Sequence, residues 1–296
     1  MLDLRHDARW RLAMHLVSCG SGDPILFIHG MPTNSRLWSG VTDRLRERYT
    51  CLAVDLPGLG KTPHMQYGPD YLRRVAEHVD ALRIENGIEK WHVVGHDAGA
   101  AVAVHYAHFF QKRVHHLALL SPSVFPELRP YFLLEPLRKP VLGEVLAPLI
   151  HLIFWRIAMH RALAGKKDRD EILRDFCAPF SGLRGPWQFM RAMRWGKPSR
   201  LLEDVPGFLP QLLMPTLIFH GSRDAAIHEG FAQRAHSLIP NSRLLTLDSG
   251  HFIPLHKPEV VATWLAKFFG NCRPESGRGC GDGAMAGREP RPEVSW

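Results

Sequence analysis

The chain has 296 residues, 45% hydrophobic and 22% charged, so it can bury a large core. Its formal net charge of +8 comes from no single basic run. Between Pro122 and Leu212 the basic residues are scattered among apolar ones and do not follow a track of aromatic side chains, which argues against nucleic-acid binding. The composition favours one globular domain with an insertion.

The cysteines indicate the compartment. Five cysteines, an odd number with no C-x-x-C pair, argue against a disulfide framework and a structural zinc site. The segment MLDLRHDARWRLAMHL lacks the uninterrupted apolar core of a signal peptide, so we expect a cytoplasmic protein. The longest apolar stretch, VLGEVLAPLIHLIFWRIAM, is interrupted by Glu144, Pro148 and His151 and predicts a buried or lid helix without integral membrane association.

Short apolar segments alternate with amphipathic ones along the chain. This pattern predicts an α/β fold with a mostly parallel sheet flanked by helices, in which chemistry lies at the carboxyl ends of the strands. Strands are expected in PILFIHG, TCLAVDLPG, WHVVGHD, VHHLALLSP, TLIFHGSRD and SRLLTLDSG. Helices are expected at about residues 36–48, 71–86, 98–110, 230–239 and 258–269.

The alternation stops after Ser121 and resumes with a strand at Thr216. The segment between them is rich in Pro, Leu, Trp and Arg and predicts an inserted, mainly helical cap over residues 122–212. Residues 1–121 and 213–270 then form the core. The segment 271–296 is rich in Gly and Pro and nearly devoid of aliphatic residues, which is typical of a disordered tail.

The segment VVGHDAGA, residues 93–100, predicts a strand that turns sharply into a helix. A side chain presented at such a turn requires very small residues two positions before and after it, and Gly95 and Gly99 meet that requirement. Asp97 therefore stands where a nucleophile is presented. The alternative is that Asp97 caps a helix that happens to begin with small residues.

Two further candidates follow strands later in the chain. Asp224 lies in HGSRD and His251 in DSGHF, which completes the order nucleophile, acid, base. His251 is then the predicted base and Asp224 the acid that orients it. Asp248 is an alternative acid, but it is better placed to end the strand before His251.

The loop HGMPT follows the strand that starts at Ile25. In a fold with such a turn, this loop and the residue after the nucleophile supply backbone N–H groups to an oxyanion hole, which here predicts Met31 and Ala98. Gly30 permits close approach of the backbone, and Pro32 holds the turn. His29 is expected to have a structural role.

One motif resembles a phosphate-binding loop. PGLGKT ends like that loop, but Asp55 occupies the position of its first glycine, so no nucleotide site is predicted. No H-E-x-x-H motif or Cys/His cluster predicts a metal, and His115 and His116 are neighbours in a strand and point to opposite faces. We therefore expect neither a metal nor a cofactor.

Together, these motifs resemble the α/β-hydrolases that use an Asp nucleophile, namely epoxide hydrolases and haloalkane or haloacid dehalogenases. The resemblance covers roughly residues 24–270 and rests on HGMPTNSRLW, DLPGLGKT, VVGHDAGA, HGSRD and SGHFIPLHKP, of which GHDAG is the specific one. It implies that the Asp97 carboxylate attacks carbon and forms an alkyl ester. His251 would then activate water against that ester, while Asp224 orients the imidazole.

The chain departs from the dehalogenase pattern. Similar dehalogenases usually carry Trp directly after the nucleophile and often Asn in the loop that reads HGMP here, whereas this chain has Ala98 and Met31. The side chains that remain as candidates for binding a halide or the substrate are Trp38 and, in the predicted cap, Trp155, Trp187 and Trp195.

Epoxide hydrolases typically use two cap tyrosines to protonate the opening oxygen, and the predicted cap has only Tyr131. We interpret the chain as a hydrolase that opens an epoxide, or a similarly strained electrophile such as a lactone, on a small apolar substrate with water. Haloalkane dehalogenation is the alternative. A non-catalytic small-molecule binder on the same fold is an alternative of a different class, and homo-oligomerisation is left open.

Overall fold

The central feature of the computed structural model, which describes residues 13–129, 132–194 and 201–270, is one seven-stranded sheet. Its strand order is β1-β3-β2-β4-β5-β6-β7. Only β1 is antiparallel to its neighbour, and the other adjacent pairs are parallel. The strands are β1 (Leu16–Cys19), β2 (Asp23–Ile28), β3 (Tyr49–Val54), β4 (Trp91–His96), β5 (Val114–Leu120), β6 (Thr216–Gly221) and β7 (Ser242–Leu247).

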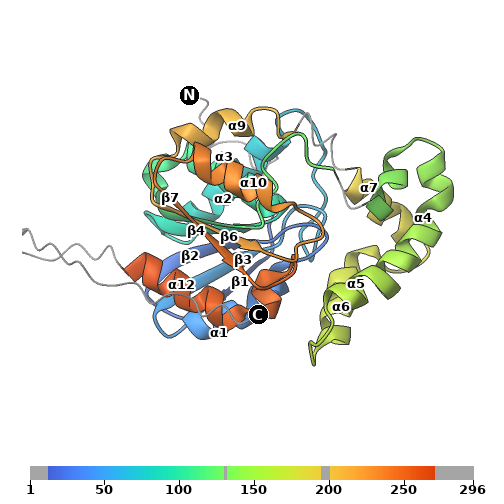
Figure 1. Cartoon of the computed structure of the whole chain (residues 1–296), viewed down its shortest axis with the longest axis horizontal. Coiled ribbons are helices and arrows are strands. Elements are labelled where there is room, and N and C mark those ends of the chain that lie inside the picture. The colour runs from blue at the N-terminus through green and yellow to red at the C-terminus, as the bar shows by residue number, and fades with distance from the viewer. Residues whose placement is uncertain (1–12, 130–131, 195–200, 271–296) are drawn as a thin grey trace, which may run out of the picture.

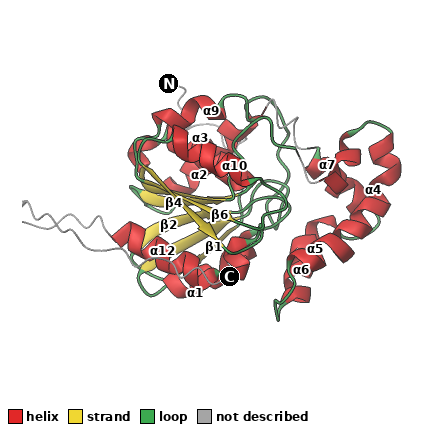
Figure 2. Cartoon of the chain, viewed as in Figure 1, coloured by secondary structure: helices red, strands yellow, loops and turns green. Residues whose placement is uncertain are grey.

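Helices cover both faces of this sheet (Figures 1 and 2). On one face lie α2 (Tyr71–Glu85), α3 (Ala98–Phe109) and α10 (Glu229–Leu238), and on the other lie α1 (Ser39–Leu45) and α12 (Pro258–Gly270). The central strand β4 is buried along its whole length, as expected for a parallel strand packed on both sides. The predicted α/β fold is therefore confirmed.

The edge strand β1 was not predicted. It is short and half-exposed, and it pairs Leu16 with Val54 and Cys19 with Cys51. Because only part of its surface is buried, its sequence lacks the strong apolar pattern that marks the central strands. In the structure, β1 pairs with the outer edge of β3 and forms the edge strand of the sheet.

A mainly helical segment is inserted between β5 and β6, as the fold prediction requires. Its long α4 (Leu142–Ile153) continues through a π-helical turn (Phe154–Ala158) into α5 (Met159–Ala162). The other helices in the described part of the segment are α6 (Arg169–Cys177), α7 (Gly185–Met193), α9 (Val205–Phe208) and three 3-10 helices (Phe132–Arg138, Ala178–Phe180 and Leu209–Gln211). The predicted tail, residues 271–296, lies outside the described residues.

The core of the inserted segment is aromatic. Trp155 and Phe189 have ring centroids 5.8 Å apart, and Phe180 lies 5.3 Å from Phe189. The apolar stretch predicted as a buried or lid helix is buried on one face only, because Ala147 and Ile150 face this core while Val145 and Leu149 face solvent. An apolar sequence predicts burial, and only the packing shows which face is covered.

Candidate active site

Asp97 lies at the turn from β4 into α3, near the carboxyl ends of the strands. Its backbone has φ 49° and ψ −120°, a region that non-glycine residues rarely occupy, which is typical of a strained functional position. Backbone hydrogen bonds hold the turn: the Asp97 N–H donates to Leu120 O at 3.0 Å, and the Ala100 N–H donates to Asp97 O at 3.0 Å. The side chain is thereby directed out of the sheet.

The turn requires glycine on both sides of Asp97. A Cβ on Gly95 would lie 2.6 Å from Gly99 O, and one on Gly99 would lie 2.3 Å from His29 O. In the loop after β2, a Cβ on Gly30 would lie 2.5 Å from the Asp97 side chain. The backbone of the loop after β2 therefore approaches the start of α3 more closely than any side chain permits.

This close approach predicts the effect of Gly99→Ala. The added methyl group meets backbone carbonyls that cannot rotate away, so we expect the free energy of unfolding to fall by about 1–3 kcal/mol. Gly207→Ala is the control, because a Cβ there has no heavy atom within 4 Å. Chemical denaturation measures both variants, and equal midpoints for the two would contradict the expectation.

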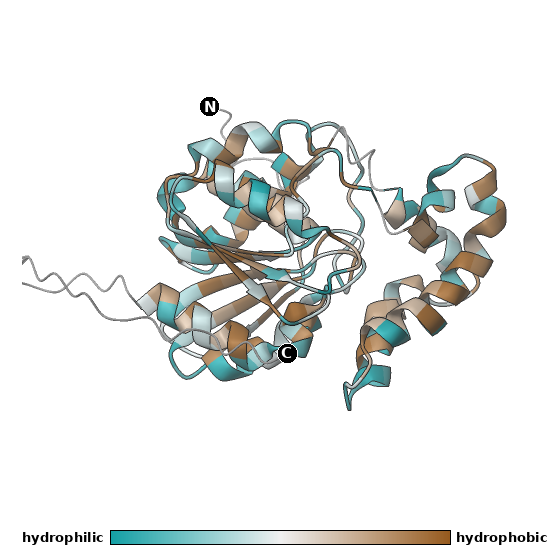
Figure 3. Cartoon of the chain, viewed as in Figure 1, coloured by the Kyte–Doolittle hydropathy of each residue, from teal (hydrophilic) through white to brown (hydrophobic). Residues whose placement is uncertain are grey.

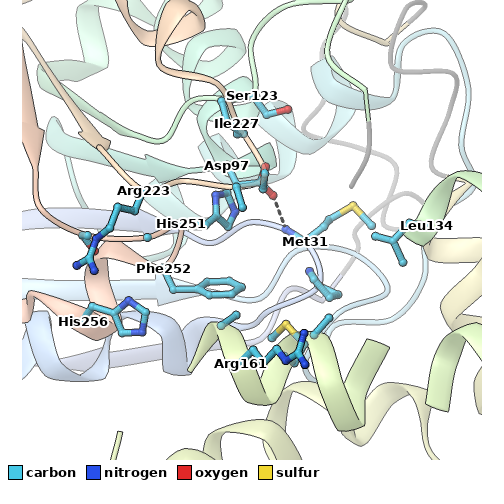
Figure 4. Close-up of a pocket in the computed structure, with 18 of the residues that line it drawn as sticks. Met31, Asp97, Ser123, Leu134, Arg161, Arg223, Ile227, His251, Phe252 and His256 are labelled. Carbon is cyan, nitrogen blue, oxygen red and sulfur yellow. Dashed lines mark hydrogen bonds between the residues drawn. The ribbon is translucent and has the colours of Figure 1, made fainter. Parts of the chain in front are cut away.

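The Asp97 carboxylate is held by two backbone amides. The Met31 N–H donates to Oδ2 at 2.9 Å (Figure 4), and the Ala98 N–H also bonds to this carboxylate. Burial raises the pKa of Asp97, while the nearby His251 and the two amides oppose that rise by stabilising the charge. The structure thus brings both predicted oxyanion-hole residues to the predicted nucleophile.

His251 and Asp224 follow the ends of β7 and β6 and form a pair. His251 Nδ1 donates to Asp224 Oδ2 at 2.9 Å, and the Asp224 side chain is fully buried. The other oxygen, Oδ1, accepts from the N–H groups of Ala226 at 2.8 Å and Ile227 at 2.9 Å. All three predicted triad residues are therefore brought together.

The charges of the pair support each other. Although burial disfavours a charge on Asp224, the His251 charge and N–H hold the pKa of this carboxyl below its usual range. Burial likewise disfavours the imidazolium, but Asp224 and Asp97 together raise the pKa of His251 above 6.5. Asp248, the alternative acid, is exposed and pairs with Arg223 at 2.9 Å instead.

His96 was not predicted to have a role at the site. Its ring is fully buried, and Nε2 donates to the carbonyl of His251 at 2.9 Å. Burial and the nearby His251 lower the pKa of His96 to about 3, so the ring is neutral. His96 therefore fixes the loop that carries His251. The available sequence signal was its place directly before Asp97.

The loop residues around Met31 are also tied to their surroundings. His29 Nε2 accepts from the Leu56 N–H at 2.9 Å, and the His29 ring is fully buried, as a structural histidine is. Asp55, in the segment that resembles a phosphate-binding loop, accepts from the N–H groups of Ser35 at 2.7 Å and Lys61 at 2.9 Å. Its carboxylate thus holds two loops together.

A cavity of about 790 Å³ lies between the carboxyl ends of the strands and the inserted segment. Asp97 and His251 are at its wall (Figure 4). Asp175 of α6 connects the two sides, because it accepts from Arg36 Nη1 at 2.8 Å. The apolar side chains of the lining include Met31, Leu128, Leu134, Phe154, Met159, Met193, Leu202, Ile227 and Phe252.

The tryptophans proposed as substrate contacts are not at this cavity. Trp38 is buried beneath the site, 5.1 Å from Phe27 between ring centroids. Trp155 belongs to the aromatic core of the inserted segment, and Trp187 Nε1 donates to the Glu144 carbonyl at 3.2 Å. These three indole rings therefore contact other parts of the protein and not the cavity. Tyr131 and Trp195 lie outside the described residues.

The relatives of the chain include enzymes with a named activity. A haloalkane dehalogenase of Agrobacterium fabrum is 28% identical over 88% of this chain and 90% of its own length. A cis-3-alkyl-4-alkyloxetan-2-one decarboxylase of Shewanella oneidensis is 24% identical over 86% and 84%. A soluble epoxide hydrolase of a Corynebacterium species is 37% identical over 36% of this chain and 37% of its own length.

A structural comparison and a family model are consistent with these sequence relatives. The crystal structure of a putative ancestral haloalkane dehalogenase superimposes with a TM-score of 0.72 at 23% identity, over 87% of this chain and 95% of that one. The model of the alpha/beta hydrolase family matches residues 25–264. The chain therefore belongs to the alpha/beta hydrolase family, and the protein is a hydrolase of that fold.

Proposed function

We propose that this hydrolase uses Asp97 as its nucleophile and forms a covalent alkyl ester with its substrate. The observation that carries the proposal is the position of the Asp97 carboxylate, which the Met31 amide contacts at 2.9 Å in the wall of an apolar cavity that also contains His251. A carboxylate in that position attacks an electrophilic carbon, and the leaving group departs with the electron pair.

Hydrolysis of the ester then uses the remaining residues. His251 accepts a proton from water, and the water oxygen attacks the carbonyl carbon of the Asp97 ester. The amides of Met31 and Ala98 stabilise the oxyanion that forms on Asp97, since they already bond to its carboxylate. Asp224 holds the imidazole in place and stabilises its positive charge.

An epoxide is the first candidate substrate. The apolar cavity suits a small apolar molecule, and one relative is named as a soluble epoxide hydrolase. Trp38, Trp155 and Trp187 do not line the cavity, so none of them is placed to bind a halide there, which weighs against dehalogenation. Tyr131 remains the proposed donor of a proton to the opening oxygen.

A strained lactone is the second candidate, because its leaving group needs no proton. If Asp97 attacks the alkyl carbon of an oxetan-2-one, the ring carbon–oxygen bond breaks and a carboxylate leaves. Among the described lining residues, basic side chains such as Arg129, Arg161 and Lys166 outnumber the acidic ones, which suits that anion. One relative is named for action on such a ring.

The test compares wild-type turnover of an aryl epoxide, a bromoalkane and a dialkyl oxetan-2-one. Diol formation supports epoxide opening, bromide release supports dehalogenation, and loss of the lactone supports the second candidate. In heavy-oxygen water, ester hydrolysis transfers the label to the Asp97 carboxyl over several turnovers, which peptide mass spectrometry detects. Turnover without label in Asp97 would show that water attacks the substrate directly. Ligand binding without turnover would favour a non-catalytic binder.

The charge state of His251 predicts the pH dependence. Only neutral imidazole accepts a proton from water, and in the ester, where Asp97 carries no charge, Asp224 is the group that still raises the pKa of His251. The hydrolysis rate of the ester should therefore fall as the pH drops through that raised pKa, by about tenfold per unit below it. Single-turnover measurements of ester decay record this profile. A rate that stays constant from about pH 8 to about pH 5 would exclude His251 as the base.

A further inference from the structure

The outward face of α4 is an exposed apolar surface. Val145 is 71% exposed, and Leu149 and Leu152 are each 55% exposed. Their spacing of four and three residues places them on one side of the helix. Figure 3 shows hydrophobic residues along α4, and the face continues with Val141, Leu142 and Ile157.

Among the residues that the structure describes, none covers this face. The opposite side of the same helix is buried through Gly143, Ala147 and Ile150. Contiguous apolar surface of this kind marks a binding face, because isolated exposed aliphatic side chains are ordinary but a row of them is not. The helical segment Leu142–Ala162 is also long and apolar enough to cross a membrane by length and composition, with a mean hydropathy of 1.5.

Crossing a membrane would nevertheless dismantle the inserted segment. Phe154 and Trp155 of this helix are almost fully buried against Phe189 of α7, so the helix cannot leave without exposing that core. The helix also carries Arg156 within its π-helical turn. Its geometry fits a helix that lies on a bilayer surface rather than one that spans it.

Basic residues flank the apolar face at both ends. Lys139 is exposed just before α4, and Arg156 is exposed at the other end. The acidic residues closest to the face along the chain are Glu135 and Glu144, and Glu144 is paired with Arg194. This distribution is complementary to an anionic lipid surface.

We propose that the outer face of α4, defined by Val141, Leu142, Val145, Leu149, Leu152 and Ile157, docks on an anionic lipid bilayer. A second copy of the chain fits less well, because antiparallel packing of two such helices brings Lys139 of each copy near Arg156 of the other. The chain also carries a net charge of +8, which opposes self-association.

Docking would place the cavity next to the lipid. The same helical segment supplies Phe154, Ala158, Met159 and Ala162 to the cavity lining. The lipid and the cavity would therefore lie on opposite sides of one helical segment. The docking itself does not depend on the proposed reaction.

The test measures sedimentation of the full chain with vesicles of phosphatidylcholine alone and of phosphatidylcholine mixed equally with phosphatidylglycerol. We expect binding to the anionic vesicles that weakens at high salt. The triple variant Val145→Gln/Leu149→Gln/Leu152→Gln should bind at least about 30-fold more weakly. The matched control is Ile84→Gln/Leu183→Gln/Leu213→Gln, which changes three exposed aliphatic residues elsewhere and should bind like the wild type.

A charge variant separates the two contributions. Lys139→Glu/Arg156→Glu should lose the preference for anionic vesicles. Three results would overturn the proposal: no wild-type binding to anionic vesicles, equal binding by the triple variant, or binding lost equally in the matched control. Light scattering tests whether a second copy of the chain binds to this face instead. If the wild type forms a dimer that the triple variant does not form, and no vesicle binding is seen, the face belongs to a dimer interface.

Discussion

His251→Gln should stop the reaction at the covalent ester. Glutamine cannot accept a proton from water, whereas Asp97 and the two amides that contact it are unchanged, so the first displacement proceeds once. We expect the steady-state kcat to fall by about 10⁴-fold or more, with a burst of about one equivalent. The intact mass should rise by the whole substrate for an epoxide or lactone and by the alkyl fragment for a bromoalkane, mapped to the Asp97 peptide.

His256→Gln is the control for that variant, since His256 also lines the cavity but is not paired with Asp224. It should keep the wild-type burst and turnover to within a fewfold. Full turnover by His251→Gln, or an adduct on a peptide without Asp97, would remove the basis for the proposed ester intermediate.

Asp97→Ala should abolish both the adduct and turnover. No other described acidic side chain bonds to the Met31 and Ala98 amides, so no other carboxylate is placed to attack. We expect kcat/KM to fall by about 10⁴- to 10⁶-fold. Because alanine at a φ of 49° is strained, Asp97→Asn is made alongside it, and its mass is checked for reversion to Asp.

Asp248→Ala is the matched control, because Asp248 also lines the cavity but pairs with Arg223 at the surface. It should retain near-wild-type turnover. A folded Asp97→Asn protein, by thermal unfolding, that still turns over at the wild-type rate with its Asn intact would rule out nucleophilic attack by Asp97.

Much of the fold was predictable because its causes are local in the sequence. The apolar segments 93–96 and 117–120 form buried parallel strands, since strands covered on both faces read as continuous apolar runs. The glycines around Asp97 were predictable for a steric reason, and the structure shows the backbone carbonyls that leave no room for a Cβ. The edge strand β1 escaped prediction because it is short and only partly buried.

The sequence predicted a set of candidate site residues, but only the folded chain showed which of them contact one another. Asp224 and Asp248 were both open as the acid until the loops after β6 and β7 placed the first in the interior and the second in solvent. The role of His96 at the His251 carbonyl depends on a contact between residues far apart in the chain. The tryptophans could not be assigned from the sequence, because indole rings serve packing and binding equally well.

The α/β fold, the strained turn that presents Asp97 and the order of the candidate residues at the strand ends could all be predicted from the amino-acid sequence. These features follow from apolar periodicity and from steric limits within a few residues. Three features could be seen only in the folded chain. They are the His251–Asp224 pair, the positions of Trp38, Trp155 and Trp187 away from the cavity, and the exposure of the outer face of α4. Those features depend on which distant surfaces meet, and local patterns carry no information about that choice.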